Sequence, residues 1–220
     1  MILYVNGCSH TYGDEAGGPE FAYGNHIAKN LNYSYVNHAE VGCSNDSIIS
    51  RTRDYLRVNT PDFIIIGWTS FERETWEYNG RQYHVNSNNP RDHDFPKELL
   101  ERYKNYVIRS HEATRQLHKL LKSYCDIYDL HCLLREKNIN HLFFNAFQSF
   151  ENLKNFKIPL YNWEPNECYI DPYSDSNTYY QWLVNKGFEP YPKFYHHGPE
   201  AHKEWANFLL PKIKHLISST

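Results

Sequence analysis

The chain has 220 residues, of which 40% are hydrophobic, and a formal net charge of -3. This length allows one domain with a sizeable core, while no apolar run is long enough to span a bilayer and the charge gives no reason to expect nucleic acid as a partner. Met1 runs directly into an apolar stretch, so we expect no signal peptide. Five cysteines without paired spacing predict reduced thiols and a cytoplasmic location.

Apolar runs alternate with amphipathic stretches along the chain, which is typical of a parallel sheet with helical crossovers. The run at 63–67 is uninterrupted, as expected of a central strand that is covered on both faces. The pattern predicts a three-layer α/β/α sandwich. We expect strands at 2–6, 34–38, 63–67 and 141–146, and helices at 21–31, 45–58, 96–137 with a break near Tyr124, and 199–217.

Two segments do not fit this minimal alternation. Residues 71–97 are polar and rich in Asn, His and Arg, and residues 148–194 are rich in Tyr, Asn and Pro with little periodicity. We interpret both as insertions in a single domain that spans 1–220. Because both leave the sheet at its carboxyl edge, they are expected to overhang a ligand site there and to set substrate choice.

The first candidate functional residue is Ser9. The apolar strand at 2–5 leads into a turn with Gly7, Cys8 and Ser9, followed by Gly13. Glycines allow a sharp turn, and the turn places the Ser9 hydroxyl at the carboxyl end of a strand, where open α/β sheets bind ligands. An incidental serine in a strand-to-helix turn is the alternative interpretation.

The second candidate is His196, in the loop before the last predicted helix. Pro199 suits the first turn of that helix, and Glu200 suits the positive end of its dipole. A nucleophile and its base need only be adjacent in space, so Ser9 and His196 can act together although they lie at opposite ends of the chain. The neighbouring His197 is the alternative base, and we expect His202 to have a packing or capping role.

In these motifs the chain resembles the SGNH/GDSL hydrolase superfamily. The first block of that family matches Gly7-Cys8-Ser9, the second matches the segment around Gly42, and the last matches the segment 196–202. The resemblance implies a flavodoxin-like SGNH fold and a serine esterase or deacetylase that works without a cofactor, on a small-molecule or carbohydrate ester. The lack of a long apolar run separately predicts no membrane partner.

The sequence departs from the family pattern at two points. Thr69 and Ser70 stand where the third block has an asparagine, and Lys193 and Phe194 stand where an aspartate precedes the catalytic histidine. A backbone carbonyl, Asp171 or Asp175 are the alternatives for orienting His196. A degenerate, inactive member of the family is compatible with the same gap.

The resemblance implies an oxyanion hole formed by the backbone N–H groups of Ser9 and Gly42. Thr69 or Ser70 would supply a third donor, and Asn45 would orient the Gly42 loop or simply cap a helix. Arg73, between two glutamates, is interpreted as a solvated surface charge, with a grip on an anionic substrate as the alternative.

Two other functions remain open on the same residues: an acyltransferase in which an alcohol replaces water, and a decayed hydrolase that binds glycans. The thirteen histidines lack the spacing of a zinc motif, so we predict no metal site. Cys125 and Cys132 have helical spacing, and we expect both on one buried face.

Overall fold

The computed structural model describes residues 1–87, 95–154, 168–192 and 195–219. Its centre is a parallel four-stranded sheet with the strand order β2-β1-β3-β6. The four strands are β1 (Ile2–Gly7), β2 (Ser34–Asn37), β3 (Phe63–Trp68) and β6 (Asn140–Asn145). This order places β1 and β3 in the middle of the sheet, side by side, and the central position predicted for the run at 63–67 is confirmed.

The register aligns the carboxyl ends of the two central strands. Gly7 of β1 pairs with Gly67 of β3, and Gly67 in turn pairs with Phe144 of β6. Beyond β6, Phe143 forms a single parallel bridge with Tyr169, so the sheet begins a fifth strand position without completing it. The segments that follow β1 and β3 therefore emerge next to each other at one edge.

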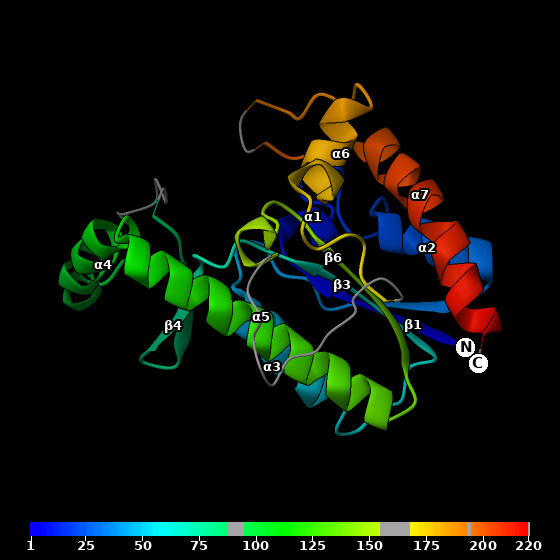
Figure 1. Ribbon diagram of the computed structural model, residues 1–220, viewed down its shortest axis with the longest axis horizontal. Helices are drawn as coiled ribbons and strands as arrows, with labels where there is room; N and C mark the ends of the chain where they lie inside the picture. The colour runs from blue at the N-terminus through cyan, green and yellow to red at the C-terminus, as the bar shows by residue number, and fades with distance from the viewer. Residues whose placement is uncertain (88–94, 155–167, 193–194, 220) are drawn as a thin grey trace.

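Helices cover both faces of the sheet (Figure 1). On one face, α3 (Asn45–Tyr55) and α5 (Ala113–Glu136) pack against alternate residues of β3, including Ile64 and Ile66. On the other face, α2 (Tyr23–Leu31), α6 (Tyr179–Asn185) and α7 (Pro199–Ser218) pack against Ile65 and its neighbours. Every residue of β3 is buried, so the predicted α/β/α sandwich is confirmed.

The segment 71–97 contains a β-hairpin, which sequence patterning did not predict. Strands β4 (Glu74–Tyr78) and β5 (Arg81–Val85) pair in antiparallel fashion around Asn79 and Gly80, which both have positive φ angles. An Asn-Gly pair with this geometry suits a tight hairpin turn. The hairpin packs against α4 (Lys97–Ser110), and both project from the end of α5 that is remote from α7 (Figure 1).

The predicted helix break near Tyr124 is wrong. The chain leaves helical geometry at residues 111–112 instead, between α4 and α5, and α5 then runs unbroken to Glu136. The Gln116 side chain donates to the Ser110 carbonyl at 3.0 Å, which satisfies one exposed end of α4. Tyr124 is buried in the middle of α5 and packs edge-on against Phe150, so tertiary packing outweighs its modest helix propensity.

The segment 148–194 holds short elements before the last helix. They are the 3₁₀ turns η2 (Glu151–Leu153) and η3 (Asp175–Asn177), and α6, whose first turn is capped by the Thr178 hydroxyl. Pro199 lies in the first turn of α7, as predicted. The remaining parts of the two predicted insertions, 88–94, 155–167 and 193–194, lie outside the described residues. None of the described helices is both long and apolar enough to cross a membrane.

Candidate active site

Ser9 is the first residue of α1 (Ser9–Tyr12), a single helical turn that starts directly after β1. The turn is tight because two glycines meet beneath it. A Cβ atom on Gly67 would lie 2.5 Å from Thr11 Oγ1 and 2.7 Å from Phe144, and one on Gly7 would lie 2.7 Å from the Gly67 carbonyl oxygen. Only glycine fits at these paired positions, so the end of the sheet fixes where the Ser9 hydroxyl emerges.

The structure brings Ser9 and His196 together. Ser9 Oγ lies 2.8 Å from His196 Nε2, although 187 positions separate the two residues. His196 precedes α7, which packs against α2, and Ser9 follows the carboxyl end of β1. Ser9 is 3% exposed and His196 is 7% exposed, so the pair is almost completely enclosed.

Glu15 lies on the other side of the imidazole. Its Oε2 atom is 3.2 Å from His196 Nδ1 and 3.3 Å from the His196 backbone nitrogen, while Asp14 Oδ2 is 3.9 Å from Nδ1. A carboxylate accepts hydrogen bonds, so the hydrogen of the neutral ring is placed on Nδ1. The lone pair of Nε2 then faces Ser9 Oγ and accepts its proton.

The loop that carries Glu15 starts where α1 ends. Gly13 closes the helix with a φ of 85°, its N–H donates to the Ser9 carbonyl at 3.0 Å, and Glu15 itself has a φ of 62°. A left-handed conformation is uncommon for a residue with a side chain and is concentrated at functional sites. The loop thus folds back and directs Glu15 toward the histidine.

The environment of His196 keeps its ring in the neutral form. Burial lowers the pKa of His196 below its ordinary value, and the nearby Asp14 and Glu15 carboxylates oppose that shift. A neutral imidazole at neutral pH is the form that acts as a base, and the same carboxylates stabilise the imidazolium once the proton has moved.

Asp171 and Asp175, which the sequence offered as residues to orient His196, both form their hydrogen bonds elsewhere. Asp171 accepts a hydrogen bond from Asn177 Nδ2 at 2.9 Å, and Asp175 accepts one from the Ser149 N–H at 3.0 Å. The carboxylate beside His196 comes instead from Glu15, on the segment that carries Ser9. A usable signal was present in the sequence, because two acidic residues follow the Gly13 turn within six positions of Ser9.

Gly42 lies in the loop that follows β2, and this loop contacts the end of β1. The Glu40 N–H donates to the Gly7 carbonyl at 3.1 Å, and Cys43 Sγ lies 3.3 Å from the same oxygen. Gly42 has a φ of 83°, which explains the glycine. Within the described part of the chain, the N–H groups of Gly42 and Ser9 donate to no other residue, so both remain available to a ligand oxygen.

The three polar residues around the end of β3 have different roles. Asn45 clamps Thr69, since Oδ1 accepts from the Thr69 N–H at 2.9 Å and Nδ2 donates to the Thr69 carbonyl at 3.1 Å. Its other amide hydrogen bonds Ser123 at 2.9 Å, and Ser44 rather than Asn45 caps α3. Asn45 is therefore occupied as a positioning residue.

The hydroxyl of Ser70 is also occupied, because it donates to Gln148 Oε1 at 2.7 Å. By contrast, Thr69 Oγ1 is buried and has no hydrogen-bond partner among the described residues. Of the two hydroxyls predicted as a third oxyanion donor, Thr69 is the one that remains free to donate.

Three further histidines surround the pair. His10 is buried with its ring centroid 4.7 Å from that of His196, and neither of its ring nitrogens has a partner in the described structure. His197 lies beside Tyr180 with a ring separation of 5.3 Å, whereas Ser9 Oγ bonds His196. His202 lies within hydrogen-bond distance of Tyr179 OH at 3.2 Å, which agrees with the packing role expected for it.

A group of possible metal ligands lies away from Ser9, where α5 packs against the outer strand β6. The ligand atoms of His131, His141 and Cys168 lie within 4.8 Å of one another. The Ile139 carbonyl is 3.0 Å from His141 Nδ1, which places the hydrogen there, and His141 Nε2 then accepts from His131 Nδ1 at 2.8 Å. The imidazoles thus form a hydrogen-bonded pair, and Cys168 Sγ lies 3.3 Å from the same His131 Nδ1. Cys132 is exposed, contrary to the predicted buried face.

Comparison with known proteins identifies the fold. No known sequence family and no curated protein matches this sequence. Solved structures do match over nearly the full length of both chains. A protein of the G-D-S-L lipolytic family from Desulfitobacterium hafniense is 13% identical, covers 96% of this chain and 99% of its own, and has a TM-score of 0.50.

Two similar structures give the same result. TesA is 11% identical over 98% of this chain and 99% of its own, with a TM-score of 0.52. The acetyl xylan esterase AlAXEase is 14% identical over 96% of this chain and 98% of its own, with a TM-score of 0.51. The chain therefore has the α/β fold of the GDSL/SGNH lipolytic proteins, at low sequence identity.

Proposed function

We propose that this protein is a serine esterase or deacetylase that acts by acyl transfer through Ser9. The observation that carries the proposal is the continuous hydrogen-bonded series from Ser9 Oγ to His196 Nε2 at 2.8 Å, and from His196 Nδ1 to Glu15 Oε2 at 3.2 Å. A serine is a weak nucleophile unless an adjacent base accepts its proton, and the base works best when a third group orients it.

In the first step, Ser9 Oγ attacks the ester carbonyl while its proton moves to His196 Nε2. The negatively charged oxygen of the tetrahedral intermediate accepts hydrogen bonds from the N–H groups of Ser9 and Gly42, and the Thr69 hydroxyl is the third donor. His196 then gives its proton to the leaving alcohol, and the acyl group stays on Ser9. A water molecule, deprotonated by His196, then attacks the acyl carbonyl. The Ser9 Oγ–acyl bond breaks, His196 returns its proton to Ser9 Oγ, and the acid leaves, so the enzyme returns to its starting state without a cofactor.

The substrate class follows from chemistry and from fold similarity. A serine acyl-enzyme mechanism acts on an activated acyl group such as an ester, and one solved structure with this fold is an acetyl xylan esterase. We therefore place O-acetyl groups on carbohydrates first among the esters to be tested. Loops after β3 and β6 bring Arg73 and Phe147 close to His10, so the substrate meets aromatic and cationic side chains beside the serine.

Labelling with a small fluorophosphonate tests this function, because the reagent modifies an activated serine whatever its natural substrate. We expect one adduct, mapped to Ser9 by mass spectrometry, which is absent in Ser9→Ala and strongly reduced in His196→Ala. Ser50→Ala, which changes an exposed serine on α3, should label like the wild type. A folded wild-type protein that remains unlabelled would overturn the proposal and favour a decayed, glycan-binding protein.

Acyl transfer to an alcohol is a second candidate because Ser9 and His196 are so well enclosed, at 3% and 7% exposure. A site that admits little water favours an acceptor alcohol over hydrolysis. The two reactions are separated by product analysis. When a sugar alcohol is supplied with an activated acetate ester, a hydrolase releases acetate alone, whereas a transferase produces the acetylated sugar in excess of acetate.

A further inference from the structure

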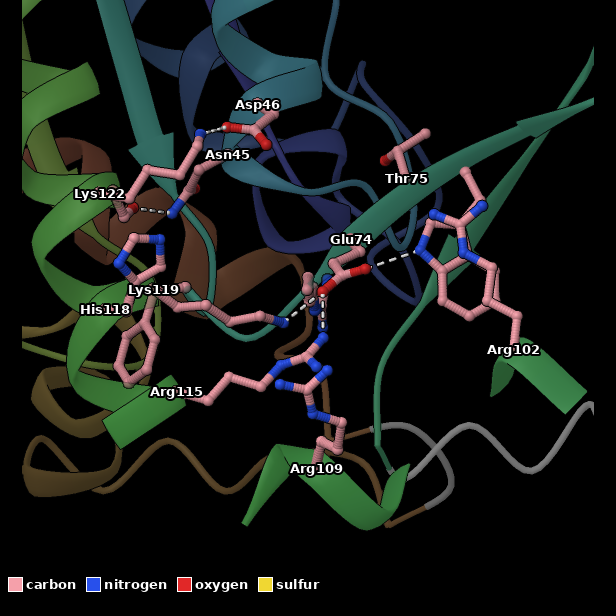
Figure 2. A pocket seen from close by; sticks show the side chains of 14 residues that line it. Asn45, Asp46, Glu74, Thr75, Arg102, Arg109, Arg115, His118, Lys119 and Lys122 are labelled. Atoms are coloured by element: carbon pink, nitrogen blue, oxygen red, sulfur yellow. Dashed lines mark hydrogen bonds and ion pairs between the residues drawn. The ribbon is translucent and has the colours of Figure 1, made fainter. Parts of the chain in front are cut away.

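A cavity of about 450 Å³ lies beside the candidate active site, between β4, α4 and α5. Its walls are strongly cationic, whereas the whole chain has a formal charge of -3. Figure 2 shows side chains from α4 and α5 pointing toward Glu74 of β4. Two carboxylates, Asp46 and Glu74, face six cationic side chains: Arg73, Arg102, Arg109, Arg115, Lys119 and Lys122.

The two carboxylates are already paired. Glu74 bonds Arg115 at 3.1 Å and Lys119 at 2.6 Å, and Asp46 bonds Lys122 at 2.7 Å. Burial alone would raise the pKa of Glu74, but the hydrogen bonds from Lys119, Trp76 and Arg115 lower it, so the group stays ionised. Glu74 thus holds Arg115 and Lys119 in place and does not neutralise the cavity.

Three arginines carry the excess charge. Arg102 has no ion pair within the described residues, and its guanidinium lies 4.1 Å from the centre of the Trp76 ring. Among the described residues, the one ion pair of Arg109 is with Glu112, at 3.5 Å, and Glu112 does not line the cavity. Arg73 is half-buried, and its buried Nη1 atom has no hydrogen-bond partner in the described structure.

The cationic groups are held on a packed scaffold. Trp76 of β4 packs edge-on against Tyr106 of α4, and Tyr106 OH donates to the Glu72 carbonyl at 2.7 Å. A smaller adjoining cavity of about 290 Å³ shares Arg102, Arg109 and Arg115 with the first. The arginines therefore face a space that exists before any ligand enters, which reduces the ordering cost of binding.

We propose that this cavity binds a phosphate or diphosphate group. Arginine presents a planar fork of donors that matches a phosphate, and several arginines around one space favour a multiply charged oxyanion over a carboxylate. Trp76 and Phe71 supply an apolar wall against which the rest of such a ligand can pack. The ligand class is thus a phosphorylated small molecule or a diphosphate-linked one.

The site adjoins the candidate active site. Asn45 lines the cavity and also clamps Thr69, and Arg73 lines the cavity and lies 5.5 Å from the ring of Phe147. Phe147 in turn packs against His10, next to Ser9, with a ring separation of 4.3 Å. The phosphate site is inferred from its own residues and does not depend on the esterase proposal.

Isothermal titration calorimetry of the protein with inorganic phosphate and with pyrophosphate tests the inference. We expect saturable binding that weakens as sodium chloride is added, and no comparable binding of acetate. The double variant Arg102→Gln/Arg109→Gln should lose about tenfold or more in affinity. Both side chains are exposed on α4, so the fold is expected to persist, and circular dichroism checks it.

Lys104→Gln is the matched control, because Lys104 is an exposed cation on the same helix that does not line the cavity. Unchanged affinity in the double variant, an equal loss in the control, or acetate binding as tight as phosphate would each overturn the site. Tighter binding of pyrophosphate than of phosphate supports a diphosphate ligand, and the reverse supports a monophosphate.

Fluorophosphonate labelling of the same samples keeps the two proposals apart. Phosphate binding without Ser9 labelling would leave the cavity as a binding site and overturn the esterase. Ser9 labelling without phosphate binding would do the opposite.

Discussion

Replacing Glu15 with glutamine removes a negative charge from beside His196. It keeps an oxygen that can accept hydrogen bonds from the Nδ1–H and the backbone N–H of His196. At the observed 3.2 Å and an effective dielectric constant of about 20, a unit charge stabilises the imidazolium by about 5 kcal/mol. Asp14, at 3.9 Å from the same nitrogen, retains part of this effect. We therefore expect a net loss of about 3–4 kcal/mol, which is about 10²- to 10³-fold in the rate of Ser9 acylation.

The assay is the second-order rate constant for fluorophosphonate labelling of Glu15→Gln, followed across pH. The plateau should fall by that factor, and the acid limb should move to lower pH, because the carboxylate that opposes the burial-induced lowering of the His196 pKa has gone. A general loss of packing would not move the acid limb.

Asp14→Asn is the matched control, because it changes the adjacent carboxylate. It should cost less than about tenfold, because the Asp14 side chain is 35% exposed against 18% for Glu15, so solvent screens its charge more, and because Glu15 keeps its hydrogen bond to Nδ1. The reasoning is refuted if Glu15→Gln labels within about threefold of the wild type, or if Asp14→Asn has the larger effect.

Three other changes test the supporting structure. Asn45→Ala leaves the buried N–H and carbonyl of Thr69 without partners, so denaturant unfolding should show a loss of about 2–4 kcal/mol together with slower labelling; unchanged values would contradict the clamp. Gly67→Ala places a Cβ 2.7 Å from Phe144 and should lower the stability by about 1–3 kcal/mol, seen as a lower Tm. Burial lowers the pKa of His141 to about 4 and that of His202 to about 3, so below about pH 6.5 the unfolded state binds more protons than the folded state. The free energy of unfolding should therefore fall as the pH is lowered from about 6.5 to 4, by about 1.4 kcal/mol per pH unit for each group. A flat pH profile of stability in urea titrations would contradict this.

The sheet and its helices were predictable because their signals are local. The apolar run at 63–67 and the Gly-rich turn around Ser9 can each be recognised from their own residues, without knowing which segments pack against them. The order of the motifs along the chain then predicted that Ser9 and His196 would meet. The strands, the helices and the turn at Ser9 all depend on local residue patterns, which are visible in the sequence itself.

The features that sequence patterning missed depend on contacts between distant segments. Nothing local to Glu15 says that His196 will lie beside it, 181 positions away, and a carboxylate in a turn usually remains solvated. The hairpin from Glu74 to Val85 was predicted as a polar insertion because, of its two strands, only Trp76 and Val85 are buried, so the sequence has no clear apolar alternation. The cationic cavity could not be predicted from the sequence for the same reason. The arginines of α4 and α5 look like ordinary surface residues until the two helices and β4 are brought together.

The placement of Glu15 divides the candidate site between the two ends of the polypeptide. Ser9 and Glu15 lie within one short loop after β1, whereas His196 lies on the distant segment before α7. The imidazole therefore reaches Ser9 only when α7 has docked against α2. Under the proposed mechanism, labelling of Ser9 then reports that docking as well as the chemistry of the site.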